Sequence, residues 1–289
     1  MFKRVIAGMQ YLFGLYAPGR DLSVFPDDVF IVSYPKSGNT WTRFLTGNLL
    51  CPDRAIDFSN INQIIPDPEA LTCRQLDVMS RPRVIKSHQY FDPRYPRIIY
   101  IVRDPRDVAV SQYHFHRKRR LVTDGSSVDH FVTRFVAGQT SPYASWGDNV
   151  ASWLITRNGR PDFLLLRYED MLENTVRELA RVASFLHIQA TAEHLANAAG
   201  KSSAAEMRRL EKSQSHLWSS TRDTRQDVPF VREARSGGWQ TQLPTSALKK
   251  IEAAWSGIMK YLGYELSSPE ACEGVASGLL EGTLNEALR

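Results

Sequence analysis

The sequence predicts an α/β fold with a parallel sheet at its centre, formed as one domain over residues 1–289. Three observations predict it. Four short apolar runs are continuous rather than alternating, helical segments separate them, and 43% of the residues are hydrophobic, enough for a sizeable core. Strands that are buried on both faces of a parallel sheet carry continuous apolar runs of this kind. The chain of 289 residues is longer than most domains but within the range of one large α/β domain.

The expected strands are rich in Val, Ile, Phe and Leu. They cover residues 29–34, 84–86, 98–102 and 163–166. Helices are expected over residues 40–50 and 171–186, because apolar side chains recur there at helical spacing. A strand followed by a helix, repeated along the chain, is the order of an α/β protein.

The first strand runs directly into the loop "YPKSGNTW", residues 34–41. This loop places Lys36, a hydroxyl and Gly38 immediately before a helix. Unpaired backbone N–H groups and the positive end of the helix dipole meet at such a position. The loop therefore predicts an anion site. It is not a Walker A loop, because G-x-x-x-x-G-K-[ST] occurs nowhere in the chain.

A second anion-competent junction follows the third strand, in "YIVRDPRDVAVSQYHF", residues 100–115. Asp104 as N-cap and Pro105 as first helical residue make a strong helix start. Ser111 comes seven residues after the cap and so lies on the same face of the helix. The spacing allows Arg103 and Ser111 to converge on one ligand. The alternative is an ordinary capped helix with Arg103 in a surface ion pair.

The charge of the chain is modest overall but locally concentrated. The net charge of +5 does not require a nucleic-acid-binding surface. The segment from Arg81 to Arg120, however, contains eleven basic and three acidic residues, so an anionic ligand is expected there. A polar, turn-rich segment over residues 213–240 carries further arginines and is expected to be either a flexible lid or a surface loop.

Three scattered cysteines without C-x-x-C spacing argue against a disulfide framework and a zinc site, and favour the cytoplasm. In the N-terminal segment, residues 1–26, the uncharged run over residues 5–19 is too short to span a membrane. Residues 1–20 are expected to pack as a helix or at most to contact a membrane peripherally.

The two junctions and three further stretches together resemble the sulfotransferases that use 3′-phosphoadenosine 5′-phosphosulfate (PAPS). "YPKSGNTW" resembles their 5′-phosphosulfate loop and "RDPRDVAVSQYHF" their 3′-phosphate motif. Three further stretches, "KSHQY", "RYEDM" and "FVREARSGGW", resemble other motifs of the family. All five stretches occur in the family's order, between Tyr34 and Trp239. The resemblance, to a cytosolic-type domain of bacterial style, implies a three-layer fold of the P-loop nucleotide kinase type with a mainly parallel five-stranded sheet. Ligands would bind at the carboxyl ends of its strands.

The resemblance also implies a set of site residues. The 5′-phosphosulfate would contact Lys36 and the backbone or hydroxyls of Ser37, Gly38, Asn39 and Thr40. The 3′-phosphate would contact Arg103, Ser111 and Arg232, and adenine would contact Trp41, Tyr168 and Ser202. Glu233 and Ala234 occupy the places of a Lys and a Gly in the family's R-K-G element, which weakens the expected contact with the 3′-phosphate, and Ala204 stands where an aromatic residue is usual. The family's C-terminal dimerisation sequence is not recognisable, so the oligomeric state stays open.

Sulfuryl transfer requires a base for the acceptor and a cation for the leaving group. His88 is the candidate base, because neutral imidazole has a pKa near the working pH and His88 resembles the family's catalytic histidine. Lys36 would stabilise the departing phosphate and Lys86 would add positive charge at the transferring group. No metal is needed in this scheme.

The acceptor is expected to be a small molecule with a hydroxyl or amine group, aromatic or lipid-like. That expectation depends on aromatic residues near the site, namely Tyr90, Phe91, Tyr95, Phe131, Phe135, Tyr143 and Trp146. Ordinary packing is the alternative for each of them. Two other functions remain open: a nucleotide-dependent phosphotransferase on the same fold, and a non-catalytic binder of nucleotides or polyanions. Nucleic acid is not expected as a partner.

Overall fold

The computed structural model describes residues 18–267. The structure contains a short 3₁₀ turn, four strands and twelve α-helices within that range. The elements are η1 (Gly19–Asp21), β1 (Val29–Ser33), α2 (Asn39–Leu50), α3 (Ile61–Ile64), α4 (Cys73–Asp77), β2 (Val84–Ser87), β3 (Arg97–Val102), α5 (Pro105–Lys118), α6 (Val128–Val136), α7 (Trp146–Arg157), β4 (Phe163–Arg167), α8 (Tyr168–Glu173), α9 (Thr175–Phe185), α10 (Ala192–Lys201), α11 (Ala204–Gln214), α12 (Trp239–Gln242) and α13 (Thr245–Tyr261).

The strands form one parallel sheet in the order β2-β1-β3-β4, with β1 and β3 at its centre. All four apolar runs predicted from the sequence are strands, and the α/β class is confirmed. The expected count of five strands is wrong for the part of the chain described. The fifth strand was implied by the resemblance alone, without an apolar run of its own, and the residues after β4 fold into helices α8 to α11.

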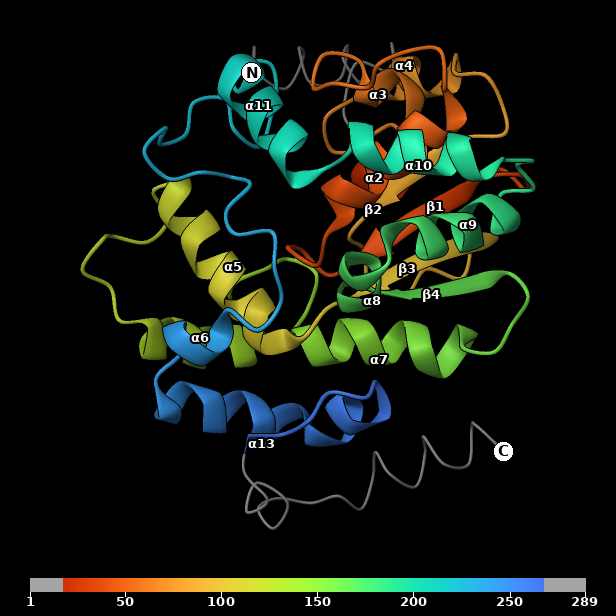
Figure 1. The fold of residues 1–289 in the computed structure, drawn as a ribbon. Coiled ribbons are helices and arrows are strands. Elements are labelled where there is room, and N and C mark those ends of the chain that lie inside the picture. Colours follow the sequence, from red (N-terminus) through yellow and green to blue (C-terminus); the bar gives the residue numbers. More distant parts are fainter. Residues whose placement is uncertain (1–17, 268–289) are drawn as a thin grey trace, which may run out of the picture.

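Two hydrophobic cores flank the sheet, because alternate residues of each strand point to opposite faces. Phe30, Val32 and Tyr100 face one core, which α5, α6, α7 and α13 complete. Ile31 and Ile101 face the other, which α2, α9, α10 and α11 complete. Figure 1 shows this arrangement, with α7 and α13 stacked on the side of β4 and the sheet between the two sets of helices. The architecture is therefore three-layered.

One predicted helix divides in two. The expected helix over residues 171–186 is broken at Asn174, whose side chain accepts a hydrogen bond from the backbone N–H of Arg177 and caps α9. By contrast, the helix start at Asp104 is confirmed, since its side chain accepts a hydrogen bond from Arg106 N–H and Pro105 opens α5.

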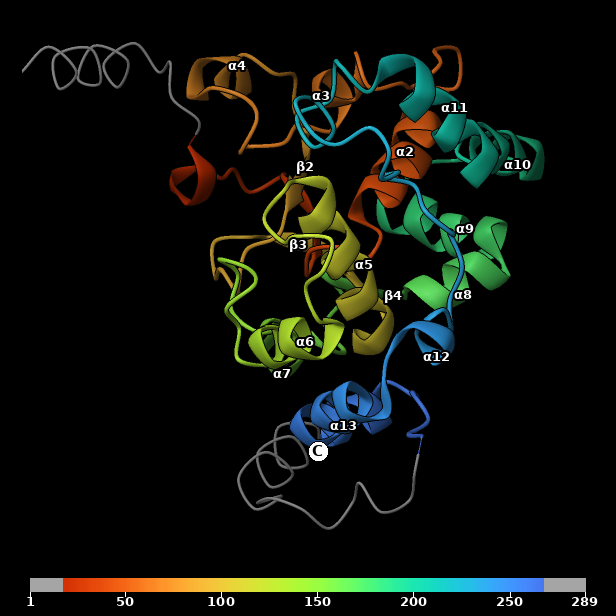
Figure 2. The same ribbon diagram turned by 90° about the vertical axis from the view of Figure 1, so that its left-hand side faces the viewer.

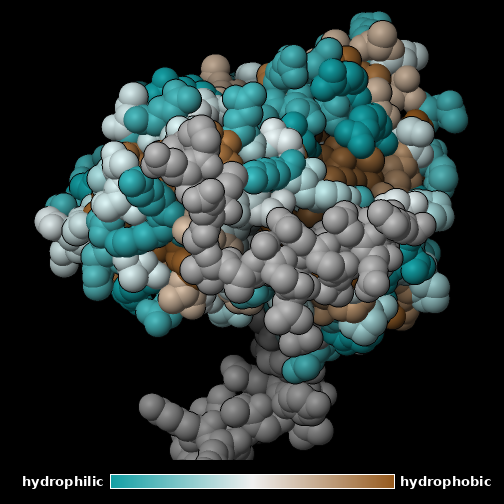
Figure 3. All heavy atoms as spheres, turned by 90° about the horizontal axis from the view of Figure 1, so that it is seen from below, coloured by the Kyte–Doolittle hydropathy of each residue, from teal (hydrophilic) through white to brown (hydrophobic). Residues whose placement is uncertain are grey.

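The segment predicted as a lid, residues 213–240, includes the end of α11 and the start of α12, and residues 215–238 between these helices form no helix or strand. Figure 2 shows it running beside α5 toward α12. The surface on the side of α13 is mainly hydrophilic among the described atoms, with small hydrophobic patches (Figure 3). The predicted membrane contact of residues 1–20 falls almost entirely outside the described residues. Between residues 18 and 267, no helix has the length and apolar character needed to cross a bilayer.

Candidate active site

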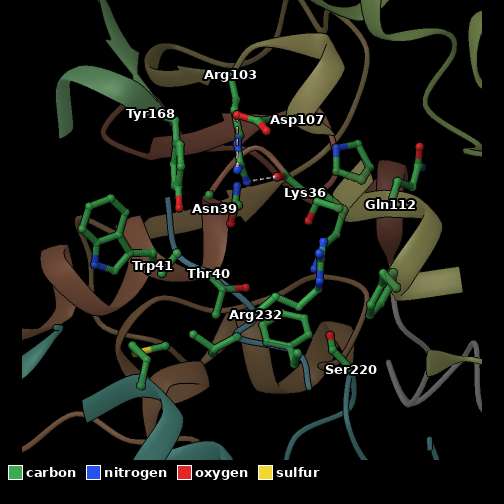
Figure 4. A pocket seen from close by; sticks show the side chains of 18 of the residues that line it. Lys36, Asn39, Thr40, Trp41, Arg103, Asp107, Gln112, Tyr168, Ser220 and Arg232 are labelled. Atoms are coloured by element: carbon green, nitrogen blue, oxygen red, sulfur yellow. Dashed lines mark hydrogen bonds and ion pairs between the residues drawn. The ribbon is translucent and has the colours of Figure 1, made fainter. Parts of the chain in front are cut away.

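A cavity of about 760 Å³ opens at the carboxyl ends of the strands. Its wall is built from the loop after β1, the end of β2, the residues that follow β3 and β4, helix α5, and the segment between α11 and α12. Figure 4 shows Lys36, Thr40, Arg103, Tyr168 and Arg232 around it. The two anion-competent junctions predicted from the sequence thus face one cavity.

The loop after β1 has a backbone that favours glycine at one position. Gly38 has a φ of 104°, and a Cβ at this position would lie 2.6 Å from Cδ2 of Tyr168. Helix α2 begins at the next residue, and Thr42 is the first whose N–H reaches a helical acceptor, the Gly38 carbonyl. The N–H groups of Asn39, Thr40 and Trp41 therefore precede the helical hydrogen bonds and can bind an anion.

The side chain of Asn39 fixes this loop to the sheet. Its Nδ2 donates to the carbonyl oxygen of Ile31 at 3.1 Å and to that of Ser87 at 3.3 Å. Because those oxygens belong to β1 and β2, one amide ties the loop to both strands. The side chain of Asn39 is thus occupied in positioning the loop.

Lys36 lies inside the cavity without a carboxylate bound to its ammonium group among the described residues. Its Nζ is 4.4 Å from the ring centroid of Phe115 and 4.1 Å from that of Phe230. Burial, followed by the charges of Arg103 and Arg232, lowers the pKa of Lys36 to about 7. A phosphate at this position would give the Lys36 ammonium group a negatively charged partner.

Arg103 connects the two junctions, since its Nη1 donates to the carbonyl oxygen of Lys36 at 3.5 Å. Its guanidinium lies 4.2 Å from the ring centroid of Tyr168 and donates to the carbonyl oxygen of Arg235 at 2.9 Å. Asp107, in the first turn of α5, accepts the backbone N–H groups of Gly237 and Trp239 at 2.8 and 3.0 Å. Ser111 lines the same cavity from α5. Sequence reasoning missed this role of Asp107 because its partners lie 130 and 132 residues away along the chain.

Arg232 lines the cavity, and so do Glu233 and Ala234. Its guanidinium donates to Oε1 of Gln242 at 2.8 Å and to Oε1 of Glu233 at 3.3 Å. Ala234 adopts a left-handed φ of 52°. The departure Glu233-Ala234 therefore places a carboxylate beside a candidate phosphate ligand.

Of the three residues expected to contact adenine, Trp41 and Tyr168 line the cavity and Ser202 does not. The rings of Trp41 and Tyr168 meet edge to face with centroids 5.6 Å apart. Trp41 Nε1 donates to the carbonyl oxygen of Ser202 at 2.9 Å. Ser202 itself is fully buried, and its hydroxyl donates to the Ala198 carbonyl, so it orients Trp41 and does not line the cavity.

Ser37 is also turned away from the cavity. Its side chain is fully buried and its backbone N–H donates to the Tyr34 carbonyl oxygen at 3.2 Å. Thr40, in contrast, lines the cavity. Of the two hydroxyls expected at the 5′-phosphosulfate, the structure brings only that of Thr40 to the site.

His88 follows β2 and lines the same cavity. Its Nδ1 lies 2.7 Å from the carbonyl oxygen of Ser33. A carbonyl can only accept, so Nδ1 carries the proton and Nε2 holds a free lone pair. Burial, followed by the charge of Lys86, lowers the pKa of His88 to about 3. The imidazole is thus neutral and its Nε2 is unprotonated. Its pKa does not lie near the working pH as the sequence led us to expect, because burial makes the ring a weaker base in the ligand-free protein.

The surroundings of His88 are charged. Lys86 pairs with Asp67 at 3.0 Å and approaches Glu69 at 3.8 Å. Tyr143 donates its hydroxyl hydrogen bond to Glu69, and its ring centroid is 5.6 Å from that of His88. Lys86 is therefore neutralised by carboxylates that the sequence did not single out.

Of the seven aromatic residues expected near the acceptor, only Tyr143 lines the cavity. Phe131, Phe135 and Trp146 are buried in the core, Tyr95 stacks on Phe30, Phe91 packs against Trp153, and Tyr90 is exposed. Packing explains these side chains except that of Tyr90. Within residues 18–267, no group of three or more His, Cys, Asp or Glu side chains is arranged to hold a metal ion.

Comparison with known proteins finds, along most of the chain, the family that the sequence motifs resemble. Residues 26–263 match the family model described as the sulfotransferase domain. The chain is 29% identical over 255 residues to Sulfotransferase 1E1 of Rattus norvegicus, covering 82% of this chain and 85% of the relative. It is 27% identical over 274 residues to Sulfotransferase 1A1 of Canis lupus familiaris, covering 84% and 87%.

Solved structures share the fold. A mouse sulfotransferase, SULT7A1, complexed with PAP has a TM-score of 0.69 at 24% identity and covers 86% of this chain and 88% of its own. Retinol dehydratase in complex with androsterone and the inactive cofactor PAP has a TM-score of 0.65 at 21% identity, covering 88% and 86%.

Proposed function

This chain belongs to the sulfotransferase domain family, and from that premise we propose how its cavity transfers a sulfuryl group from PAPS to a small-molecule hydroxyl or amine. The fold is of the kind in which an anion-binding loop follows the first strand of a parallel sheet, and this supports a P-loop nucleotide-kinase-like assignment. A relative of the same fold is complexed with PAP.

The donor end of the cavity fits a doubly phosphorylated nucleotide. Lys36 and the N–H groups of Asn39 to Trp41 would hold the 5′-phosphosulfate, with the hydroxyl of Thr40. Arg103, Ser111 and Arg232 would hold the 3′-phosphate, which ATP lacks, because arginine offers parallel donors to phosphate oxygens. A Cβ at Gly38 would lie 2.6 Å from the Tyr168 ring, so glycine at this position lets a candidate adenine contact pack against the loop.

The reaction needs one proton removed and one leaving group stabilised. Nε2 of His88 would accept the proton of the acceptor while the acceptor oxygen or nitrogen forms a bond to sulfur. The bond between sulfur and the bridging oxygen of the 5′-phosphate breaks, and Lys36 would stabilise the negative charge that this oxygen gains. Nothing is oxidised or reduced, and the products are the sulfated acceptor and 3′,5′-adenosine bisphosphate (PAP).

The single observation that carries this proposal is the placement of Lys36, Arg103 and Arg232 in one cavity with His88. Three cations suit a polyanionic donor. A neutral imidazole with a free Nε2 suits an acceptor whose hydroxyl or amine group must lose a proton. A cavity for nucleotide binding alone has no need of such a base.

The test compares nucleotides and then follows transfer. PAP should bind more tightly than ATP by isothermal titration calorimetry, whether or not Mg²⁺ is added, and PAPS should yield sulfated acceptors detected by mass spectrometry. Preference for ATP with Mg²⁺ would favour the phosphotransferase. Binding that falls steeply with salt and is not displaced by PAP would favour a polyanion binder.

We also propose a polar acceptor. Asp67, Glu69, Lys86 and Tyr143 border His88, and Gln112 and Thr140 line the cavity as a mutually hydrogen-bonded pair. Such polar side chains suit an acceptor that carries hydrogen-bonding groups in addition to the reacting one. A panel of hydroxylated acceptors of graded polarity, ranked by kcat/KM, tests this.

The cytoplasm is the proposed location. Cys51 and Cys73 are free thiols in the described part of the chain, which suits a reducing compartment.

A further inference from the structure

The segment that closes one wall of the cavity is attached to two helices by charged side chains. We call residues 225–239 the strap. Its residues 230–235 line the cavity, and it includes the candidate phosphate ligand Arg232. Figures 1 and 2 show the connection from α11 to α12 passing α5, and the strap is the later part of this connection. The strap contains no helix or strand before Trp239, so side chains from elsewhere must determine its path.

Lys118, at the end of α5, is one of these side chains. It is a lysine with only 1% of its side chain exposed. Its Nζ donates to the carbonyl oxygens of Arg225 at 3.0 Å and Val228 at 2.7 Å, and its own carbonyl accepts the N–H of Arg225 at 2.9 Å. Lys118 thus holds the beginning of the strap.

Glu211, near the end of α11, is the other. Its Oε1 accepts the N–H of Phe230 at 2.6 Å and its Oε2 accepts the N–H of Val231 at 2.8 Å. The same carboxylate pairs with Lys118 at 3.5 Å. Neither Glu211 nor Lys118 lines the cavity, so their hydrogen bonds reach the site only through the strap.

The carboxylate of Glu211 is linked to the donor site through the backbone of Phe230 and Val231. The backbone N–H that it accepts belongs to Phe230, whose ring lies 4.1 Å from Nζ of Lys36. Arg232 follows two residues later. Fixing the backbone at residues 230 and 231 therefore fixes both a ring that covers Lys36 and the approach of Arg232.

Burying a charged pair is an expensive way to attach a loop. The desolvation of two ions can exceed their attraction, and apolar contacts often stabilise as well or better. Directed hydrogen bonds, in contrast, restrain both the distance and the angle between a side chain and the backbone that it holds. The pair is better suited to placing the strap than to stabilising the fold.

We propose that Glu211, together with Lys118, is a positioning residue of the donor site that sets the strap so that Phe230 covers Lys36 and Arg232 faces the donor. This inference rests on the donor site proposed above. The strap has other attachments, since Asp107 accepts the N–H groups of Gly237 and Trp239 and Arg208 donates to the Arg232 carbonyl. Loss of the Glu211 contact should therefore shift the strap without unfolding the protein.

The main variant is Glu211→Gln, which keeps the size of the side chain but presents an amide N–H₂ to one of the backbone donors. Loss of a buried charged hydrogen bond should raise the Kd for PAP and the KM for PAPS about tenfold. The kcat and the KM for the acceptor should stay within about twofold of the wild type, because the acceptor end is unchanged. Amide hydrogen exchange at Phe230 and Val231, followed in the free protein, should accelerate.

Glu206→Gln is the matched control. Glu206 lies on the same helix and pairs with Arg209 at the exposed surface, away from the strap. It should leave the Kd for PAP, the kinetic constants and the exchange rates unchanged. If Glu211→Gln does not accumulate as folded protein, Glu211→Asp shortens the same charge, and the same split between donor and acceptor constants is expected.

The outcomes separate this inference from the function it rests on. Faster exchange with an unchanged Kd for PAP would overturn it, since the strap would move without consequence. A parallel loss of kcat and of affinity for both substrates, with a lower Tm, would mark a structural role and also overturn it. If the wild type itself does not bind PAP, the donor site fails and this inference with it, a result seen before any variant is compared.

Discussion

Nδ1 of His88 is hydrogen-bonded to the backbone carbonyl oxygen of Ser33 across a distance of 2.7 Å. The register of the sheet explains this contact, because Val32 pairs with Ser87 and the next residues along the two parallel strands are Ser33 and His88. The last residue of β1 thus orients the ring that follows β2. A base held by the backbone of the sheet keeps its tautomer whatever ligand occupies the cavity.

Replacing His88 with glutamine should abolish most of the activity while donor binding survives. A positioned general base contributes about 10²- to 10⁴-fold to the rate, so kcat should fall by that factor. The Kd for PAP should change little, because His88 lies at the acceptor end. His130→Gln, at an exposed histidine on α6, serves as the control. Near-normal turnover in His88→Gln would remove His88 from its assigned role.

His88 should not titrate near neutrality. Burial and Lys86 hold its pKa at about 3, below the ordinary value of 6.5, so the ring stays neutral from pH 8 down to pH 5. NMR of the Cε1–H resonance over that range should show no midpoint for His88. The unfolded chain, in contrast, takes up this proton below pH 6.5, so the contribution of His88 to stability declines as the pH falls from there toward the folded-state pKa. A midpoint near 6.5 in the folded protein would contradict the buried, neutral imidazole.

Binding of PAP should depend on pH through Lys36. In the free protein the pKa of Lys36 is lowered to about 7 by burial, then by Arg103 and Arg232, with Lys118 adding to the effect and Glu211 opposing it. A bound phosphate favours the protonated ammonium, so binding above pH 7 must take up a proton, and affinity should fall by up to about tenfold per pH unit above it. Calorimetry at pH 8 in two buffers of different ionisation enthalpy measures the proton uptake. Lys36→Met should abolish it; equal uptake in that variant would assign the proton to another group.

Gly38 offers a test of the loop with an internal control. Alanine at this position faces both an unfavourable φ of 104° and a contact of 2.6 Å with Tyr168, so it should displace the ring and weaken PAP binding at least tenfold. Gly159→Ala has a comparable φ of 78° but nothing within 4 Å of the new Cβ. It should cost about 1 kcal/mol of stability in thermal unfolding without changing the Kd. Equal effects of the two variants on PAP binding would show that Tyr168 does not limit the loop.

The sequence predicted the strands well because burial on both faces leaves a signal that is local and continuous. All four apolar runs became strands, and the helix start at Asp104 was readable because capping depends on neighbouring residues. The break at Asn174 was not readable, since the apolar spacing continues across it while one side chain redirects the backbone. The fifth strand had no apolar run behind it, and the described residues contain none.

The site was predictable in its charges but not in its orientations. The charged residues and the candidate base line one cavity, namely Lys36, Arg103, Arg232 and His88. Three of them lie in loops that directly follow strands, and Arg232 belongs to a stretch that resembles a family motif. Whether a hydroxyl points into a cavity depends on packing, and so Ser37 and Ser202 could not be distinguished from Thr40. Glu211 was missed for another reason: its partners lie nineteen and twenty residues away in a segment without periodic structure.

Glu233 provides a test of the departure from the family's R-K-G element. Its carboxylate lies in the cavity wall, where it engages Arg232 at 3.3 Å and Arg235. A carboxylate beside a phosphate site repels the ligand and competes for the same guanidinium. Glu233→Gln should therefore tighten PAP binding about threefold to tenfold at low salt, and the gain should shrink as salt screens the charge. Titration of PAP at two ionic strengths measures both effects. Weaker binding in the variant would instead mean that Glu233 holds Arg232 in its binding position, and that the carboxylate serves the donor site by orientation rather than opposing it by charge.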